Sequence, residues 1–192
     1  MKKSNSLKAK KHNSRFLLHV VTGSIAAYKA GDLSKALRDE QNWQIDCVMT
    51  KGASKFVTPL TLHALSGGKV YDDAFVLDDD YPVLHTSLAE KADLILVAPA
   101  SANFIARLAA GLADDLASCV ILATAKPVFL IPAMNDQMYA HPITQENINK
   151  LKKIGYRIME PIEGQLVCGK YAMGHIPDIK DILSFIAAEL KK

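Results

Sequence analysis

Cysteine is scarce in this 192-residue chain, and the three that occur do not form a recognisable bonding framework. Cys47, Cys119 and Cys168 are odd in number and lack the Cys-x-x-Cys spacing of zinc and dithiol sites. This arrangement argues against disulfides and against a structural metal, and it fits a reducing compartment, so we expect a cytoplasmic location. Cys47 and Cys119 fall within apolar segments and are expected in the core, whereas Cys168 does not.

Long apolar runs are also missing. None approaches the roughly 20 residues that a membrane helix requires, and the longest, around 119–124 and 128–134, are broken by lysine and proline. The basic, polar start of the chain has no apolar segment behind it, unlike a secretory signal. With 49% hydrophobic and 22% charged residues, the composition is that of a soluble globular protein, and no membrane partner is expected.

Acidic residues are absent from the first fifteen positions, which carry six of the chain's 23 bases. The formal charge of +3 therefore comes from this segment, and the rest of the chain holds more acids than bases. We expect residues 1–15 to be a disordered basic tail and residues 16–192 to form a single domain. The body of the chain gives no reason to expect nucleic-acid binding.

Strand-like and helix-like patterns alternate along the remaining sequence. Because such alternation produces right-handed parallel crossovers, we predict an α/β fold with a doubly wound, mostly parallel sheet. Helices would cover both faces, as in three-layer flavodoxin-like or Rossmann-like proteins. Strands are predicted at 16–21, 43–49, 69–71, 93–97, 127–131 and 156–159, and helices at 25–38, 54–65, 84–91, 104–110, 114–123, 147–154 and 179–190. The aspartates at 78–80 fall in an irregular stretch and are expected to be a solvated loop, not a metal site.

Small and hydroxyl-bearing residues follow three of these strands. They are Thr22-Gly23-Ser24, Thr50-Lys51-Gly52, and the segment Ala98-Pro99-Ala100-Ser101-Ala102-Asn103 after the buried strand 93–97. Backbone N–H groups at such strand-to-helix turns bind phosphates at the carboxyl edge of a parallel sheet. The single glycine of the first turn is not a Gly-x-Gly-x-x-Gly fingerprint, so a mononucleotide is favoured over a dinucleotide.

Five short motifs follow one another along the chain, and their order is informative. They are Gly23-Ser24-Ile25-Ala26-Ala27-Tyr28-Lys29, Pro82-Val83-Leu84-His85, Ala98 to Asn103, Pro132-Ala133-Met134-Asn135 and Cys168-Gly169. Over about residues 16–176 this set resembles the flavin-containing cysteine decarboxylases. It is most similar to their stand-alone branch, which acts on 4′-phospho-N-pantothenoylcysteine in coenzyme A biosynthesis.

The resemblance implies a cofactor and an assembly. FMN is expected without a covalent link, and the positions that would line it are Gly23, Ser24, Ile25, Thr50, Ser101, Ala102, Asn103 and Ala133. The resemblance also implies a homotrimer or a multiple of trimers, in which neighbouring subunits share the active site.

The implied reaction gives 4′-phosphopantetheine through oxidation of the thiol to a thioaldehyde, loss of CO2 and re-reduction of the enethiolate. His85 matches the family's active-site histidine, and Cys168 matches a cysteine on a mobile, glycine-rich loop that serves the reductive step. Asn135 matches the substrate-holding asparagine. A neutral amide suits this task because a cation would stabilise the carboxylate that has to leave as CO2. Taken singly, each of these residues also fits an ordinary role in packing, in a turn or on the surface.

Some positions depart from the family pattern. Residues 170–177 differ from the usual loop sequence, Phe104 replaces a threonine, Lys91 replaces a tryptophan and Glu90 replaces a basic residue. Two alternatives therefore stay open beside the small-molecule decarboxylase: a decarboxylase of peptides that end in cysteine, and an FMN-binding regulatory protein without catalytic activity.

Overall fold

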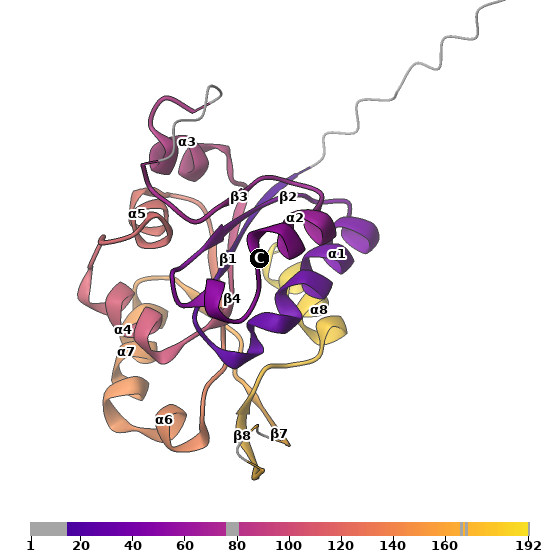
Figure 1. The fold of residues 1–192 in the computed structure, drawn as a ribbon. Coiled ribbons are helices and arrows are strands. Elements are labelled where there is room, and N and C mark those ends of the chain that lie inside the picture. The colour runs from indigo at the N-terminus through magenta and orange to yellow at the C-terminus, as the bar shows by residue number, and fades with distance from the viewer. Residues whose placement is uncertain (1–14, 76–80, 166, 168, 192) are drawn as a thin grey trace, which may run out of the picture.

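A single six-stranded sheet forms the centre of the computed structural model, which describes residues 15–75, 81–165, 167 and 169–191 (Figure 1). The strand order is β3-β2-β1-β4-β5-β6, and every neighbouring pair is parallel. This order reverses between β1 and β4, as in doubly wound nucleotide-binding folds, so the predicted fold class is confirmed. The strands are β1 Phe16–Val21, β2 Gln44–Met49, β3 Val70–Tyr71, β4 Leu94–Ala100, β5 Val128–Pro132 and β6 Arg157–Ile158.

Helices cover both faces of the sheet because its central strands are apolar on both sides. In β1, Leu17 and Leu18 are fully buried and belong to opposite layers of the core. One layer contains α1 (Ala30–Gln41), α2 (Pro59–Ser66) and α8 (Ile179–Glu189). The other contains α3 (Leu84–Lys91), α4 (Ala102–Ala110), α5 (Leu116–Ala123) and α7 (Pro142–Lys153), on the left of the sheet in Figure 1. Across the described part of the chain, no helix has the length and apolar character needed to cross a bilayer.

Several predicted boundaries were wrong for local reasons. The helix expected at 25–38 begins as a 3-10 turn, η1 (Ile25–Lys29), before α1 starts. The helix expected at 54–65 is split into η2 (Ala53–Lys55) and α2, because Pro59 occupies the first turn of α2 and Thr58 caps it. Strand β4 continues three residues beyond the predicted end, and α7 begins five residues earlier than predicted, at Pro142.

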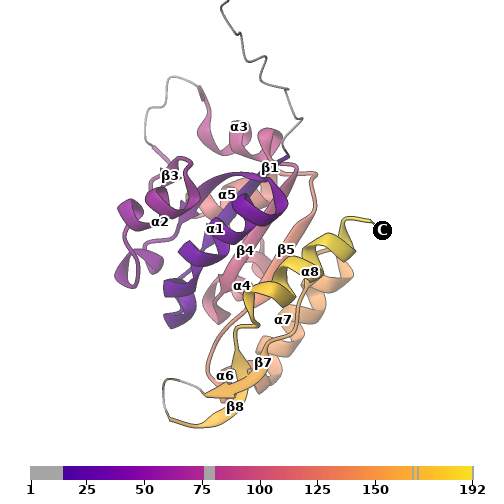
Figure 2. The same cartoon turned by 90° about the vertical axis from the view of Figure 1, so that its right-hand side faces the viewer.

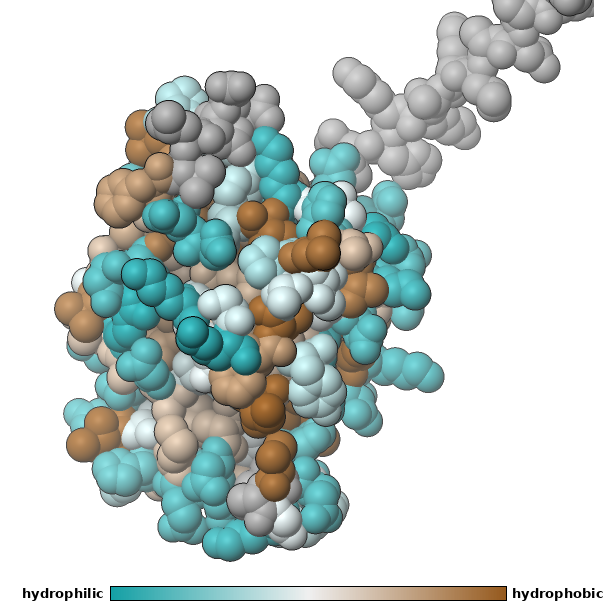
Figure 3. All heavy atoms as spheres, viewed as in Figure 1, coloured by the Kyte–Doolittle hydropathy of each residue, from teal (hydrophilic) through white to brown (hydrophobic). Residues whose placement is uncertain are grey.

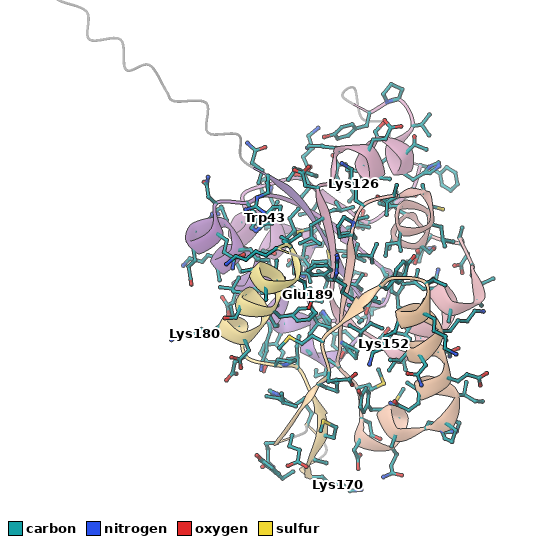
Figure 4. All side chains as sticks on the ribbon, turned by 180° about the vertical axis from the view of Figure 1, so that it is seen from behind. Trp43, Lys126, Lys152, Lys170, Lys180 and Glu189 are labelled. Carbon is teal, nitrogen blue, oxygen red and sulfur yellow. The ribbon has the colours of Figure 1, made fainter. Side chains whose placement is uncertain are left out.

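A β-hairpin that the sequence analysis did not predict projects beyond the carboxyl edge of the sheet (Figure 2). It pairs β7 (Ile162–Gln165) antiparallel with β8 (Tyr171–His175), and Lys170 stands at its tip (Figure 4). The loop that we expected here is therefore largely strand. Cys168, the tail residues 1–14 and the aspartates 78–80 lie outside the described residues.

Gly174 fastens this hairpin to the end of β5. Its φ is +127°, and a Cβ atom there would lie 2.2 Å from the Met134 carbonyl oxygen. The Met134 N–H in turn donates to the Gly174 carbonyl at 3.1 Å. Only glycine can combine this φ with so close an approach. Gly174 therefore lets the backbone of β8 touch the backbone at Met134.

A histidine lies in the core between β1, β4 and α1. His19 is fully buried, with Nε2 2.7 Å from the Ala98 carbonyl and Nδ1 2.7 Å from the Ser34 hydroxyl. Because the carbonyl can only accept, Nε2 carries the proton and Nδ1 accepts from Ser34. Burial lowers the pKa of His19 to about 4, so the ring is neutral at pH 7.

The cysteine predictions had mixed outcomes. Cys47 is buried as expected, and burial raises the pKa of its thiol to about 12, which leaves it unreactive. Cys119 is only half-buried, because it lies on the outer side of α5 with its thiol donating to the Ala113 carbonyl.

Candidate functional site

A cavity of about 370 Å³ opens at the carboxyl edge of the sheet, beside the switch point of the strand order. Its walls come from η1, the start of α4, the segment after β5 and the β7–β8 hairpin. Eight residues predicted from the sequence line it together: Gly23, Ser24, Ile25, Ser101, Ala102, Asn103, Ala133 and Asn135. Open α/β sheets bind ligands at this place in the fold.

Thr22 joins the two strand ends that flank the switch point. Its hydroxyl donates to the Pro99 carbonyl at 2.7 Å and accepts from the Ser101 N–H at 2.9 Å. Thr22 is 1% exposed, and its bond to Pro99 is buried. The turn before α4 is thereby held against the turn after β1.

Ser24 makes a similar connection to β5. Its hydroxyl donates to the Ala133 carbonyl at 2.9 Å and accepts from the Ala26 N–H at 3.3 Å, which caps η1. Two hydroxyl groups therefore fix the ends of β1, β4 and β5 relative to one another. The pocket floor is a rigid arrangement of backbone rather than a set of loose turns.

The start of α4 supplies donors for an anion. Ser101 is the N-cap, and its hydroxyl accepts from the Phe104 N–H, while Ala102 and Asn103 present the first backbone positions of the helix to the cavity. The N-terminus of a helix attracts negative charge through its unpaired N–H groups. Phe104, where a threonine was expected, is 1% exposed and packs in the core, so its ring does not enter the pocket.

Asn135 presents a neutral amide to the cavity. It caps α6 (Asp136–Ala140), and its Oδ1 accepts from the Gln137 and Met138 N–H groups at 3.0 and 3.4 Å. Since the cap occupies the acceptor end of the side chain, the NH2 group is the end left to bind a ligand. This geometry turns Asn135 into a hydrogen-bond donor at the pocket wall.

Apolar side chains form much of the remaining wall. Ile25, Met138 and Val167 line the cavity and are 49%, 50% and 78% exposed. On the face shown in Figure 3, hydrophobic side chains run down the centre towards the β7–β8 hairpin. Exposed apolar walls around a polar floor suit a flat aromatic ring that carries a phosphate.

Two predicted residues that the structure describes, Thr50 and His85, are not among those that line this pocket, and a third cannot be placed. Thr50 is buried at the end of β2, where its hydroxyl accepts from the Ala53 N–H at 3.3 Å. His85 is half-buried in the first turn of α3, and α3 lies at the end of the molecule opposite the hairpin in both Figure 1 and Figure 2. Cys168 lies outside the described residues, although its neighbour Val167 lines the cavity. The functional roles of these three residues stay predictions.

The sequence analysis missed Lys29 and His175, which face each other in the pocket. Nζ of Lys29 is 3.4 Å from Nε2 of His175, although 146 positions separate them. Lys29 closes a motif that had been recognised, but nothing in the sequence linked it to the hairpin.

Among the residues described, no group of three or more histidines, cysteines, aspartates or glutamates could hold a metal ion.

Comparison with known proteins agrees with this geometry. The family model described as Flavoprotein matches residues 4–191. A probable phosphopantothenoylcysteine decarboxylase of Streptococcus mutans is 44% identical over 176 residues, which are 91% of this chain and 98% of that protein. The coenzyme A biosynthesis bifunctional protein CoaBC of Bacillus subtilis is 42% identical over 89% of this chain, but the match spans only 42% of that longer protein.

A solved structure extends the similarity to the fold. A PPC decarboxylase mutant complexed with pantothenoylaminoethenethiol superimposes with a TM-score of 0.84 at 30% identity, covering 93% of this chain and all of that one. The resemblance carried by the five sequence motifs is therefore confirmed. A family match over nearly the whole chain, together with a pocket at the expected edge of the sheet, shows that this chain belongs to the Flavoprotein family.

Proposed function

We propose that this protein binds FMN and decarboxylates 4′-phospho-N-pantothenoylcysteine to 4′-phosphopantetheine in the cytoplasm, as a carboxy-lyase of coenzyme A biosynthesis. The observation that carries the proposal is the shared cavity, in which the donor amide of Asn135 faces the same space as the helix start at Ser101. The names of the Streptococcus mutans and Bacillus subtilis relatives support the choice of reaction and pathway.

The fit to a flavin mononucleotide rests on the pocket's own chemistry. The N–H groups at the start of α4 and the turn at Gly23 and Ser24 would hold the phosphate, and the apolar wall would take the ring system. When bound, the flavin supplies the two-electron oxidation of the substrate thiol and the return of those electrons. Thr50 would act indirectly, because it lies two residues before Gly52, and Gly52 packs closely against Gly23. A Cβ atom added to Gly23 would lie only 3.0 Å from the Gly52 Cα.

Asn135 would hold the substrate carboxylate. An amide binds a carboxylate through N–H donors without adding a positive charge, so it orients the group without resisting its conversion to neutral CO2. The α6 cap fixes the rotation of this amide, since Oδ1 is already engaged. Asn135 thus orients the scissile bond within the pocket.

His85 and Cys168 would complete the site in an oligomer. Because His85 does not line the pocket of its own chain, we propose that a neighbouring subunit supplies it, as in a trimer or a multiple of trimers. Cys168, which comes directly after the pocket residue Val167 in the sequence, would protonate the enethiolate.

The test is a product analysis with a matched variant. Flavin-loaded protein is incubated with 4′-phospho-N-pantothenoylcysteine, and CO2 and 4′-phosphopantetheine are quantified by mass spectrometry. Asn135→Asp keeps a good helix cap but replaces the donor with a carboxylate, so kcat/KM should fall about a hundredfold or more while the fold persists.

Two results would contradict the proposal. Faster turnover of a peptide ending in cysteine would assign the protein to peptide substrates. This comparison is relevant because an EpiD variant, solved with the substrate peptide DSYTC, is similar, with a TM-score of 0.78 at 25% identity over 91% of this chain and 99% of that one. Absence of CO2 from either substrate, with flavin bound, would favour a regulatory protein.

A further inference from the structure

Among the described residues that line the pocket, one is a lysine and none carries a carboxylate. The lysine is Lys29, which is half-buried at the end of η1. The ion pairs formed by the described residues do not include Lys29. Its hydrogen-bond partner is Nε2 of His175, and a neutral imidazole cannot cancel the charge of an ammonium group.

His175 holds the Lys29 ammonium group in place on the same wall. An ammonium group only donates, so Nε2 accepts from Lys29 and the proton of the neutral ring lies on Nδ1. That nitrogen is buried and has no hydrogen-bond partner within the described residues. The ring packs against Gly164, where an added Cβ would lie 2.9 Å from the His175 Cγ, so its position is fixed. Lys29 therefore gives this wall a positive charge without a counter-charge among the described residues, and the packed His175 ring fixes where that charge lies.

We propose that Lys29 and His175 form a subsite for a phosphomonoester, namely the phosphate end of the substrate assigned above. This inference rests on the proposed function and deepens it. The subsite lies at the last residue of η1 and on β8, whereas the candidate site for the flavin phosphate lies at the start of α4 and at the Gly23–Ser24 turn before η1.

The choice of anion follows from what each group does in the reaction. The carboxylate must lose its charge as CO2, and a cation bound to it would stabilise the charged substrate and so slow the reaction. The phosphate keeps its charge throughout, so a half-buried lysine can hold it without slowing the chemistry. The phosphate of the flavin has the same chemistry, and the experiment below separates the two sources.

The experiment uses flavin-loaded protein and two unreactive probes, 4′-phosphopantothenate and pantothenate, which lack the cysteine. Isothermal titration should show that the phosphorylated probe binds more tightly to the unaltered protein. Lys29→Gln should weaken its binding about 10- to 100-fold and leave pantothenate unchanged, while Lys29→Arg restores most of the difference. His175→Phe should weaken the same probe about three- to tenfold.

A matched control is Lys180→Gln, which removes the same charge from the outer side of α8 and should change neither affinity (Figure 4). The proposal is overturned if Lys29→Gln leaves the phosphorylated probe unaffected. It is also overturned if Lys29→Gln instead abolishes the preference for FMN over riboflavin, because the subsite would then belong to the cofactor. If the unaltered protein releases no CO2 but still prefers the phosphorylated probe through Lys29, the subsite stands and only the proposed reaction fails.

Discussion

Single hydroxyl groups determine how the pocket floor is built. Thr22 bonds Pro99 and Ser101, and Ser24 bonds Ala133, so neither side chain need touch a ligand to position the residues that do. A buried hydroxyl that meets two backbone groups also protects them from being left unpaired. Thr22 is therefore a positioning residue that the family motifs did not single out.

Thr22→Val tests this role with almost no change of shape. The substitution leaves the Ser101 N–H and the Pro99 carbonyl without their partner, so the free energy of unfolding should fall by about 1 to 3 kcal/mol. Flavin affinity, followed by fluorescence quenching, should fall about tenfold as the turn before α4 loosens. Thr22→Ser keeps the hydroxyl and should behave like the unaltered protein; equal losses in both variants would contradict the role of the hydrogen bonds.

His19 makes stability depend on pH. Its pKa is lowered to about 4 by burial, whereas an unfolded histidine titrates near 6.5, so the unfolded state takes up a proton first as the pH falls. Stability should therefore be fully present above about pH 6.5 and decrease towards about pH 4, by at most about 3 kcal/mol. Urea unfolding at fixed FMN concentration between pH 7 and pH 4.5 measures this slope, and His19→Gln should flatten it. An unchanged slope in His19→Gln would assign the effect to other groups.

At the scale of elements, the hairpin is held by backbone and side-chain contacts near the base of β8. Gly174 bonds Met134 at the end of β5, and Lys29 of η1 meets His175 one residue further on. The hairpin therefore forms a wall of the pocket through contacts near the base of β8, while Lys170 at its tip is exposed.

Gly174→Ala should detach this wall. An alanine at a φ of +127°, with its Cβ directed at the Met134 carbonyl, cannot keep the observed position. We expect turnover to fall at least tenfold, with cleavage of the hairpin by added protease becoming faster and the core remaining folded. Gly169→Ala is the control, since its φ of +86° is also strained for alanine but nothing lies within 4 Å of the added atom. Equal effects of the two substitutions would show that the contact with Met134 is not required.

At the scale of the whole molecule, one chain does not bring the described residues His85 and Asn135 into the same pocket. Asn135 faces the pocket, but His85 lies in α3, away from the hairpin end of the molecule. If active sites form between subunits, two inactive variants can complement each other within one assembly.

Mixing the variants His85→Asn and Asn135→Asp provides that test. Each alone should retain only a small residual activity, and random co-assembly should recover about a quarter of the unaltered activity, because one in four interfaces pairs two intact halves. Activity that stays at the level of the single variants, despite mixed assemblies seen by native mass spectrometry, would place both residues within one subunit's site.

The sequence predicted the fold well where local and global signals coincide. The bounds of β1 and α3 were correct because β1 is a mostly apolar strand buried throughout and α3 is an amphipathic segment that follows Pro82. The turns at Ser24 and Ser101 were predicted to lie together because parallel strands end at one edge of the sheet. The hairpin was missed because glycines interrupt its strands and its position depends on Met134. The pair formed by Lys29 and His175 could not be predicted, since tertiary structure alone brings distant positions together.

Lys91 stands where the family pattern has a tryptophan, and the structure explains this difference in a way that the sequence could not. Its Nζ lies 3.1 Å from Asp46 Oδ2, 2.6 Å from the Tyr81 hydroxyl and 3.7 Å from the centre of the Phe16 ring. The lysine therefore covers an aromatic ring and joins β2 to α3 within one chain. Nothing in the structure explains Glu90.

The hydroxyl bond between Ser24 and Ala133 spans 109 positions of the chain, and this has a consequence for biosynthesis. The pocket floor cannot close until β5 has left the ribosome and paired with β4, and the far wall must wait for the hairpin after it. Such long-range pairings form late in folding. A nascent chain should thus acquire flavin only when nearly complete, so flavin fluorescence on stalled chains of increasing length would report the arrival of β5 and then of the hairpin.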